Sequence, residues 1–181
     1  MAILNFMVFF PGKEKKETRF IEKIHSSLIQ NNLMGDWFNS EACDKFYKNI
    51  NKSYVLDINT VAEGDAKLHT IREDKTNRWK AGMLIDFFIN ARTKNMLRFA
   101  PRVKVVSVQK IEIEWYFENQ VVQIFIDNER MFSYDIKYPE DLSTKFKHFV
   151  QNDGFSTIED FLDYFNKDFS GKIIHWTDLK Y

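Results

Sequence analysis

The sequence predicts an α+β fold in which a mostly antiparallel sheet is flanked by helices, and three observations support it. Residues 103 to 115 alternate apolar and polar side chains with a period of two, which is typical of a long strand or a strongly bent one. The run from Met83 to Ile89 has the β-branched and aromatic content of a buried strand. From Pro139 onward the apolar period becomes helical.

Length and composition predict one folded domain over residues 1–181. The chain is long enough to bury a core, with 44% hydrophobic and 16% aromatic residues. Its 26 basic and 26 acidic residues balance, so any contact with nucleic acid must be local. The single cysteine, Cys43, cannot form an internal disulfide, and together with the lack of a secretory leader it predicts a reducing, cytoplasmic location.

The first half of the chain predicts a strand and two helices. Residues 2 to 10 form an apolar run that is too short to span a membrane and lacks a basic leader, so it is interpreted as a core strand. A helix is expected from Thr18, which could cap it, to about Asn31. A short helix capped by Ser40 follows, and then a possible strand from Tyr54 to Ile58.

The second half predicts a hairpin, two helices and a closing strand. A turn at Asn119 and Gln120 leads into a return strand at 121–126. One helix begins at Pro139, and another begins with the capping box formed by Ser156 and Glu159. Ser170 and Gly171 are expected to end this second helix, and residues 172–176 then form the last strand.

The stretch from Lys67 to Gly82 concentrates polar side chains just before the Met83 strand, and we expect it to form a loop. Cations, a hydroxyl, an imidazole and an indole suit the binding of an anion or a polar heterocycle. The ordinary alternative is a strand end whose polar groups are simply solvated. The residues concerned are Lys67, His69, Thr70, Arg72, Arg78, Trp79 and Lys80.

The spacing within this stretch constrains any joint role. Lys67 and Thr70 are three positions apart, so a regular strand would direct them to opposite faces. If they act together, the backbone between them must turn or bulge.

Several common sites have no motif in this chain. It lacks a glycine-rich phosphate loop, paired cysteines and a Gly-x-Ser-x-Gly elbow. The four histidines lack the spacing of metal ligands. We therefore expect neither a metal nor a cofactor.

Three motifs in order resemble the signature of ASCH domains, a branch of the PUA-like superfamily of small β-barrels associated with RNA. They are residues 67–72 with 77–82, the Asn-Asp-Gly-Phe-Ser run at 152–156, and the ending at 171–178, which looks like the last strand of phage and bacterial ASCH-like proteins. The resemblance implies a PUA-like, mixed and mostly antiparallel β-barrel with flanking helices. Residues from about 25 to 64 are unmatched and are interpreted as a helical insertion.

The resemblance implies that a basic cleft binds RNA or a modified nucleoside, with no membrane partner. Lys67, Arg72, Arg78 and Lys80 would neutralise phosphates. His69 is a further expected ligand-binding residue. Trp79 and Trp176 would stack on bases, although core packing is the alternative for both.

The resemblance also implies two enzymatic alternatives. Some small ASCH proteins are amidohydrolases that deacylate N4-acetylcytidine with a lysine, a threonine three residues later and a glutamate before the second helix. Here Thr70 would be the nucleophile and Lys67 the base, and Asp153 stands where the family has the longer glutamate. A ribonuclease with His69 as general base is the further alternative.

Overall fold

The computed structural model describes residues 2–11, 16–50, 65–118, 120–138 and 144–181. Over these residues the fold is α+β with two sheets rich in antiparallel pairs, as predicted. Contacts divide the chain into two compact units, each built from two separate stretches. The first unit contains Met1–Lys67 and Met83–Lys104, and the second contains Leu68–Gly82 and Val105–Tyr181. A single domain over 1–181 stays a prediction.

The sheet of the first unit is built around β3 (Leu84–Ile89), which confirms the strand predicted there. The strand β1 (Ala2–Phe6) pairs with β3 in parallel, whereas β4 (Leu97–Arg98) and β5 (Val103–Lys104) pair with it antiparallel. The strand predicted for 2–10 is thus shorter than expected.

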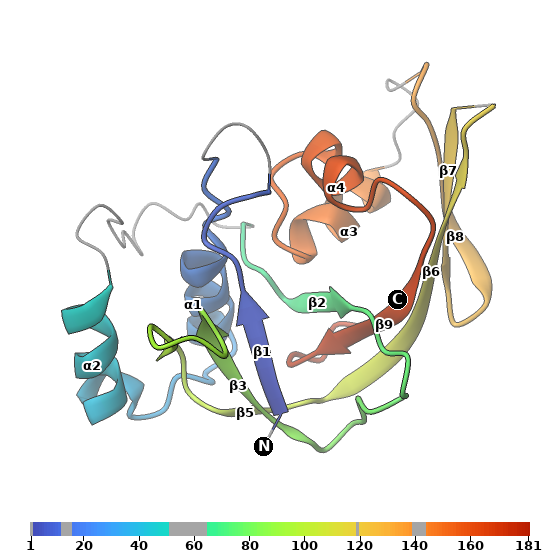
Figure 1. Cartoon of the computed structure of the whole chain (residues 1–181). Helices are drawn as coiled ribbons and strands as arrows, with labels where there is room; N and C mark the ends of the chain where they lie inside the picture. The colour runs from blue at the N-terminus through green and yellow to red at the C-terminus, as the bar shows by residue number, and fades with distance from the viewer. Residues whose placement is uncertain (1, 12–15, 51–64, 119, 139–143) are drawn as a thin grey trace. The chain divides into compact units, whose positions relative to one another are not determined.

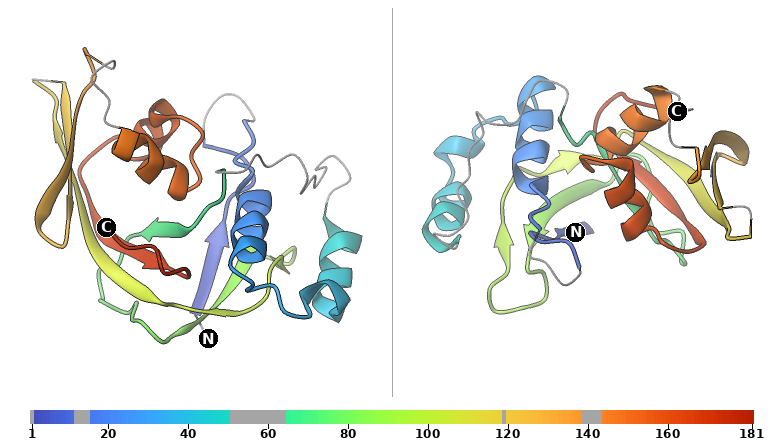
Figure 2. Two further views of the ribbon diagram at one scale, coloured as in Figure 1. Left: turned by 180° about the vertical axis from the view of Figure 1, so that it is seen from behind. Right: turned by 90° about the horizontal axis from the view of Figure 1, so that it is seen from above.

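Helices pack on this sheet through aromatic contacts. The helix α1 (Phe20–Gln30) begins two residues after Thr18, whose hydroxyl accepts a hydrogen bond from the Phe20 N–H at 3.3 Å. Phe20 meets Phe6 of β1 edge to face, and Figure 2 shows α1 beside that strand. The short η1 (Trp37–Asn39) follows.

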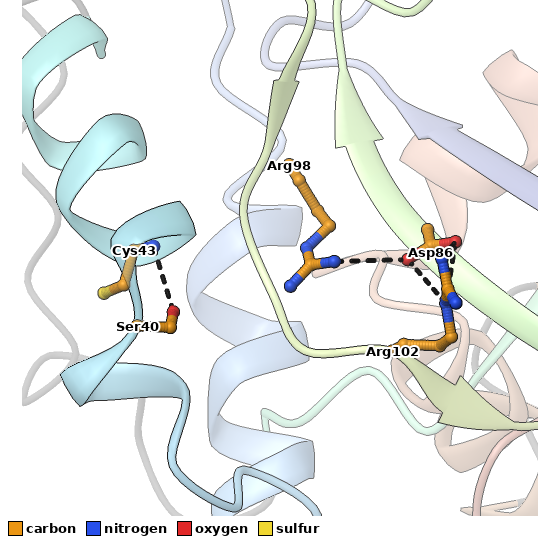
Figure 3. Close-up of polar contacts among 5 residues, drawn as sticks. All are labelled: Ser40, Cys43, Asp86, Arg98 and Arg102. Atoms are coloured by element: carbon orange, nitrogen blue, oxygen red, sulfur yellow. Dashed lines mark hydrogen bonds and ion pairs between the residues drawn. The ribbon is translucent and has the colours of Figure 1, made fainter.

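The helix α2 (Glu41–Asn49) begins as the sequence predicts. The hydroxyl of Ser40 accepts a hydrogen bond from the Cys43 N–H at 3.1 Å (Figure 3). The possible strand from Tyr54 to Ile58 lies outside the described residues.

A buried carboxylate joins β3 to the segment that contains β4 and β5. Asp86 is 1% exposed, and both of its oxygens accept hydrogen bonds from the Arg102 guanidinium at 2.9–3.1 Å. Arg98 approaches the same carboxylate at 3.6 Å (Figure 3). Two cations therefore offset the cost of burying this charge.

The sheet of the second unit has the order β2-β9-β6-β7-β8, with every neighbouring pair antiparallel (Figure 1). Its strands are β2 (His69–Arg72), β6 (Ser107–Tyr116), β7 (Val121–Ile126), β8 (Glu129–Asp135) and β9 (Phe169–His175). The predicted hairpin at β6 and β7 is confirmed. The edge strand β8 was not predicted, because its first residues are exposed and show no apolar pattern.

Three local predictions for this unit were wrong. The long strand predicted from Val103 is interrupted between β5 and β6. Residues 69–72 form a strand instead of a loop. Gly171 lies inside β9 and does not end a helix. Glycine is needed at this position because a Cβ there would lie 2.3 Å from the carbonyl oxygen of Arg72 on the neighbouring strand.

Two helices cover one face of this sheet. The helix α3 (Thr144–Asn152) places Phe149 against His69 of β2 and Phe132 of β8. The helix α4 (Ile158–Tyr164) begins one residue later than expected, because the Thr157 hydroxyl accepts the capping hydrogen bond from the Asp160 N–H.

Among the helices that the structure describes, none has the length and apolar character needed to cross a membrane. The two sheets belong to separate units, and closure of the strands into a barrel stays a prediction.

Candidate functional site

The second unit encloses a group of polar side chains that we call the His69 cluster, defined as His69, Asn152, Asp153, His175 and Tyr181. The strands β2 and β9 place the two histidines directly opposite each other, with ring centres 5.3 Å apart. Both rings are 0% exposed. Because burying unsatisfied polar groups is costly, the hydrogen bonds within this cluster decide its chemistry.

The Tyr181 hydroxyl connects β2 to the end of α3. It lies 2.8 Å from His69 Nε2 and accepts a hydrogen bond from the Asn152 amide at 3.0 Å. Burial raises the pKa of Tyr181, so the phenol keeps its proton. With its oxygen accepting from Asn152, the phenol donates its proton to Nε2, and the single N–H proton of the neutral imidazole is then on Nδ1.

Asp153 occupies the outer edge of β2. Its Oδ1 accepts a hydrogen bond from the Ile71 N–H at 3.1 Å and lies 3.5 Å from Nδ1 of His69. The carboxylate therefore takes the place of a further strand at this edge and faces the protonated nitrogen of the imidazole. Asp153, His69 and Tyr181 form a continuous polar chain, and Asp153 has a structural role whether or not it also acts on a ligand.

His175 is held in its neutral form. Neither ring nitrogen has a hydrogen-bond partner among the residues that the structure describes. Burial above all, with smaller effects of the neighbouring His69 and of Lys180, lowers the pKa of His175 to about 3, although Asp127 and Asp153 act in the opposite direction.

The three residues proposed for hydrolysis are all buried. Lys67 is 1% exposed, and Thr70 and Asp153 are each 3% exposed. Lys67 is the last residue of the first stretch of the first unit, and its ammonium lies 4.6 Å from the ring centre of Phe20. Thr70 and Asp153 belong to the second unit, so their convergence with Lys67 stays a prediction. Because side chains alternate along a strand, Thr70 faces away from His69.

Two of the predicted cations, Arg78 and Lys80, lie on the loop between β2 and Gly82. Asp74 holds this loop by accepting hydrogen bonds from the Arg78 N–H at 2.9 Å and the Trp79 N–H at 3.1 Å. Arg78 and Lys80 are exposed, and the Arg78 guanidinium lies 4.6 Å from the ring centre of Trp79. Trp79 itself is buried, so the loop presents the Arg78 guanidinium rather than the indole to solvent.

Besides His69, the remaining predicted ligand-binding residues are Trp176, which directly follows β9, and Arg72, the last residue of β2. Trp176 is 1% exposed, which agrees with core packing and leaves no free ring face. Arg72 is half-buried, and burial lowers the pKa of its guanidinium, although Tyr164 and the Asp153 carboxylate act in the opposite direction.

A hollow of about 420 Å³ lies next to the start of the loop, and we call it the Lys172 groove. It is lined by Glu73, Asp74, Lys75, Asn77, Lys110, Ser170, Gly171 and Lys172. Lys110 of β6 and Lys172 of β9 are direct cross-strand partners. Arg72 of β2 is the partner of Lys172 on its other side. Three cations therefore lie side by side across three adjacent strands, and we call this row one level of the sheet.

Not all of these charges are balanced within the second unit. Lys75 pairs with Glu73 at 3.1 Å, and Lys110 pairs with Glu112 at 3.1 Å. The Lys172 ammonium forms no ion pair or hydrogen bond with any part of the chain that the structure describes. Like charges opposite each other destabilise a sheet, so an anion in this groove would relieve a repulsion.

Sequence reasoning missed both Lys110 and Lys172. Each stands at a polar position of an alternating strand, and the register that places them side by side is not readable from either strand alone. It also missed His175 and Tyr181 as members of the His69 cluster. Among residues 2–11, 16–50, 65–118, 120–138 and 144–181, no group of histidine, cysteine and acidic side chains could hold a metal ion.

Comparison with models of protein families, with curated proteins and with solved structures found no match. The function is therefore argued from the residues of this chain.

The neutral state of His175 predicts a pH-dependent stability. In the unfolded chain this histidine takes up a proton below about pH 6.5, whereas the folded form does not until about pH 3. The free energy of unfolding should therefore fall as the pH falls through this window, by up to about 1.4 kcal/mol per pH unit from this residue. The groups that act on it are His69, Asp127, Asp153 and Lys180.

Urea unfolding between pH 7 and pH 4 measures this dependence. His175→Phe should reduce the slope of the free energy of unfolding against pH by the amount that corresponds to about one proton. His148→Gln, a change at an exposed histidine of α3, should leave that slope unchanged. A slope in His175→Phe equal to that of the wild type would show that His175 is not neutral in the folded state.

Proposed function

We propose that this protein binds RNA or a nucleoside derivative, and that the Lys172 groove with the adjoining loop is the binding surface. The level formed by Arg72, Lys172 and Lys110 is the observation that supports this most strongly. In a chain whose charges balance overall, cations gathered at one level of a sheet favour a phosphate-bearing ligand.

The loop extends this positive surface. Arg78 and Lys80 are exposed on it, and the hydrogen bonds to Asp74 fix its backbone. A fixed backbone lowers the entropy lost when these side chains bind a phosphate chain. The guanidinium of Arg78 already lies against an indole, and the opposite face of such a planar cation can stack on an unpaired base.

Membership of the ASCH branch and a PUA-like barrel are part of this proposal. The order of the motifs in the sequence supports it, as does the antiparallel sheet that joins β2 to the closing strand β9. Of the ligands expected for that family, RNA agrees with the charge of the groove through its phosphates.

Binding of single-stranded RNA should depend on Lys172 and on salt. We expect the affinity to fall steeply between about 50 and 200 mM salt, because phosphate contacts release counterions. Lys172→Glu should weaken binding roughly tenfold or more, and Lys172→Ala should reduce the slope of log affinity against log salt by about one. Filter-binding titrations at the two salt concentrations measure both effects.

Lys147→Glu is the matched control, since it reverses an exposed lysine on α3 of the same unit. RNA binding that is insensitive to salt, or equally weakened by Lys147→Glu, would rule out the groove as the binding surface.

An amidohydrolase acting on N4-acylated cytidine is the second candidate. The spacing of Lys67 and Thr70, three residues apart, with a carboxylate at Asp153 just before the last helix, supports it through the family resemblance. Incubation with N4-acetylcytidine should release cytidine, and both Lys67→Ala and Thr70→Ala should abolish turnover. Ser133→Ala, at an exposed position of β8, is the control. No cytidine from the wild type, or turnover that survives either change, would exclude this reaction.

A further inference from the structure

The first unit contains a different hollow, of about 880 Å³, formed by the end of β1, the last turn of α2 and the segment between β3 and β4. A smaller hollow of about 220 Å³ adjoins it, because Lys45, Met96 and Leu97 line both. We call the two together the α2 cleft. The larger volume is within the range of roughly 300–1,000 Å³ that is usual for small-molecule sites.

The α2 cleft is positively charged. Lys45 and Lys94 line the larger hollow and Arg98 lines the smaller one, and among the described residues that line either hollow none is acidic. Both lysines are exposed, and neither forms a recorded ion pair within the described ranges. Arg98 is oriented by Asp86 at 3.6 Å (Figure 3). The ring centre of Trp37 lies 5.2 Å from the same guanidinium. The cleft is therefore complementary to an anion.

The remaining lining suits a flat heterocycle. Phe6, Val8, Phe9 and Met96 supply apolar and aromatic surface, and Phe9 is 43% exposed. Asn49, Asn90 and Asn95 add side-chain amides, of which the Asn49 and Asn90 nitrogens already donate to the Lys45 and Asn95 carbonyls. Apolar surface with amide groups beside it matches the faces and edges of a nucleobase.

The segment that carries Lys94 is held in place. Asn90 and Arg92 adopt left-handed backbone angles, with φ of 53° and 66°. The Thr93 hydroxyl donates to the Asn90 carbonyl at 2.9 Å, and the Ala91 N–H donates to the Asn5 side chain of β1 at 2.8 Å. The positions of Lys94 and β1 are therefore coupled, which favours a preformed site.

We propose that the α2 cleft binds a mononucleotide, with the base against the apolar wall and the phosphate between Lys45 and Lys94. This site is separate from the Lys172 groove, since every lining residue belongs to the first unit. The full chain would thus carry one surface for a nucleic acid or nucleoside and one cleft for a small phosphorylated ligand.

Isothermal titration with AMP, GMP, CMP and UMP tests the proposal. At least one mononucleotide should bind saturably, and its nucleoside should bind roughly tenfold or more weakly because it lacks the charge-assisted phosphate contacts. Lys45→Glu and Lys94→Glu should each weaken the binding of the nucleotide by a similar factor. Lys48→Glu is the matched control, because Lys48 is exposed on the same helix and does not line the cleft.

The outcomes separate this proposal from RNA binding at the groove. Lys45→Glu and Lys94→Glu should leave the RNA titration unchanged, and Lys172→Glu should leave the nucleotide titration unchanged. The proposal is overturned if no mononucleotide binds saturably, if a nucleoside binds as tightly as its nucleotide, or if Lys48→Glu weakens binding as much as Lys45→Glu does.

Discussion

The structure of the second unit depends on the position of one carboxylate, that of Asp153. Its acceptance of the Ile71 N–H satisfies the outer edge of β2, which otherwise ends the sheet. The same oxygen faces His69, whose other nitrogen bonds to Tyr181. One acidic side chain therefore links the edge strand, the end of α3 and the last residues of the chain.

This arrangement explains why the polar residues of β2 differ in what they can do. His69 is enclosed between Phe149 of α3 and His175 of β9, so its role is to hold the strand in place. A buried imidazole of this kind does not suit the solvent-accessible general base of a ribonuclease. The exposed chemistry lies beyond β2, where the loop and the Lys172 groove present cations.

The sequence predicted the elements whose pattern is local. The Met83 strand, the Ser40 cap and the β6–β7 hairpin follow from apolar period and capping chemistry within a few residues. The elements it missed depend on distant partners. Gly171 was interpreted as a helix stop, but it is a glycine because the Arg72 backbone approaches it closely. The proximity of Lys110 and Lys172 likewise depends on strand register, and that of Tyr181 to His69 on the path of the final residues.

The most direct test of this account is amide hydrogen exchange at Ile71, followed by NMR. An N–H on the outer edge of an edge strand exchanges rapidly unless something other than a strand bonds to it. If Asp153 fixes this edge, the Ile71 amide is protected in the wild type. In Asp153→Ala it should lose much more protection than amides of the central strand β6. Rapid exchange of Ile71 in the wild type, or protection that is unaffected by Asp153→Ala, would contradict the central role of this carboxylate.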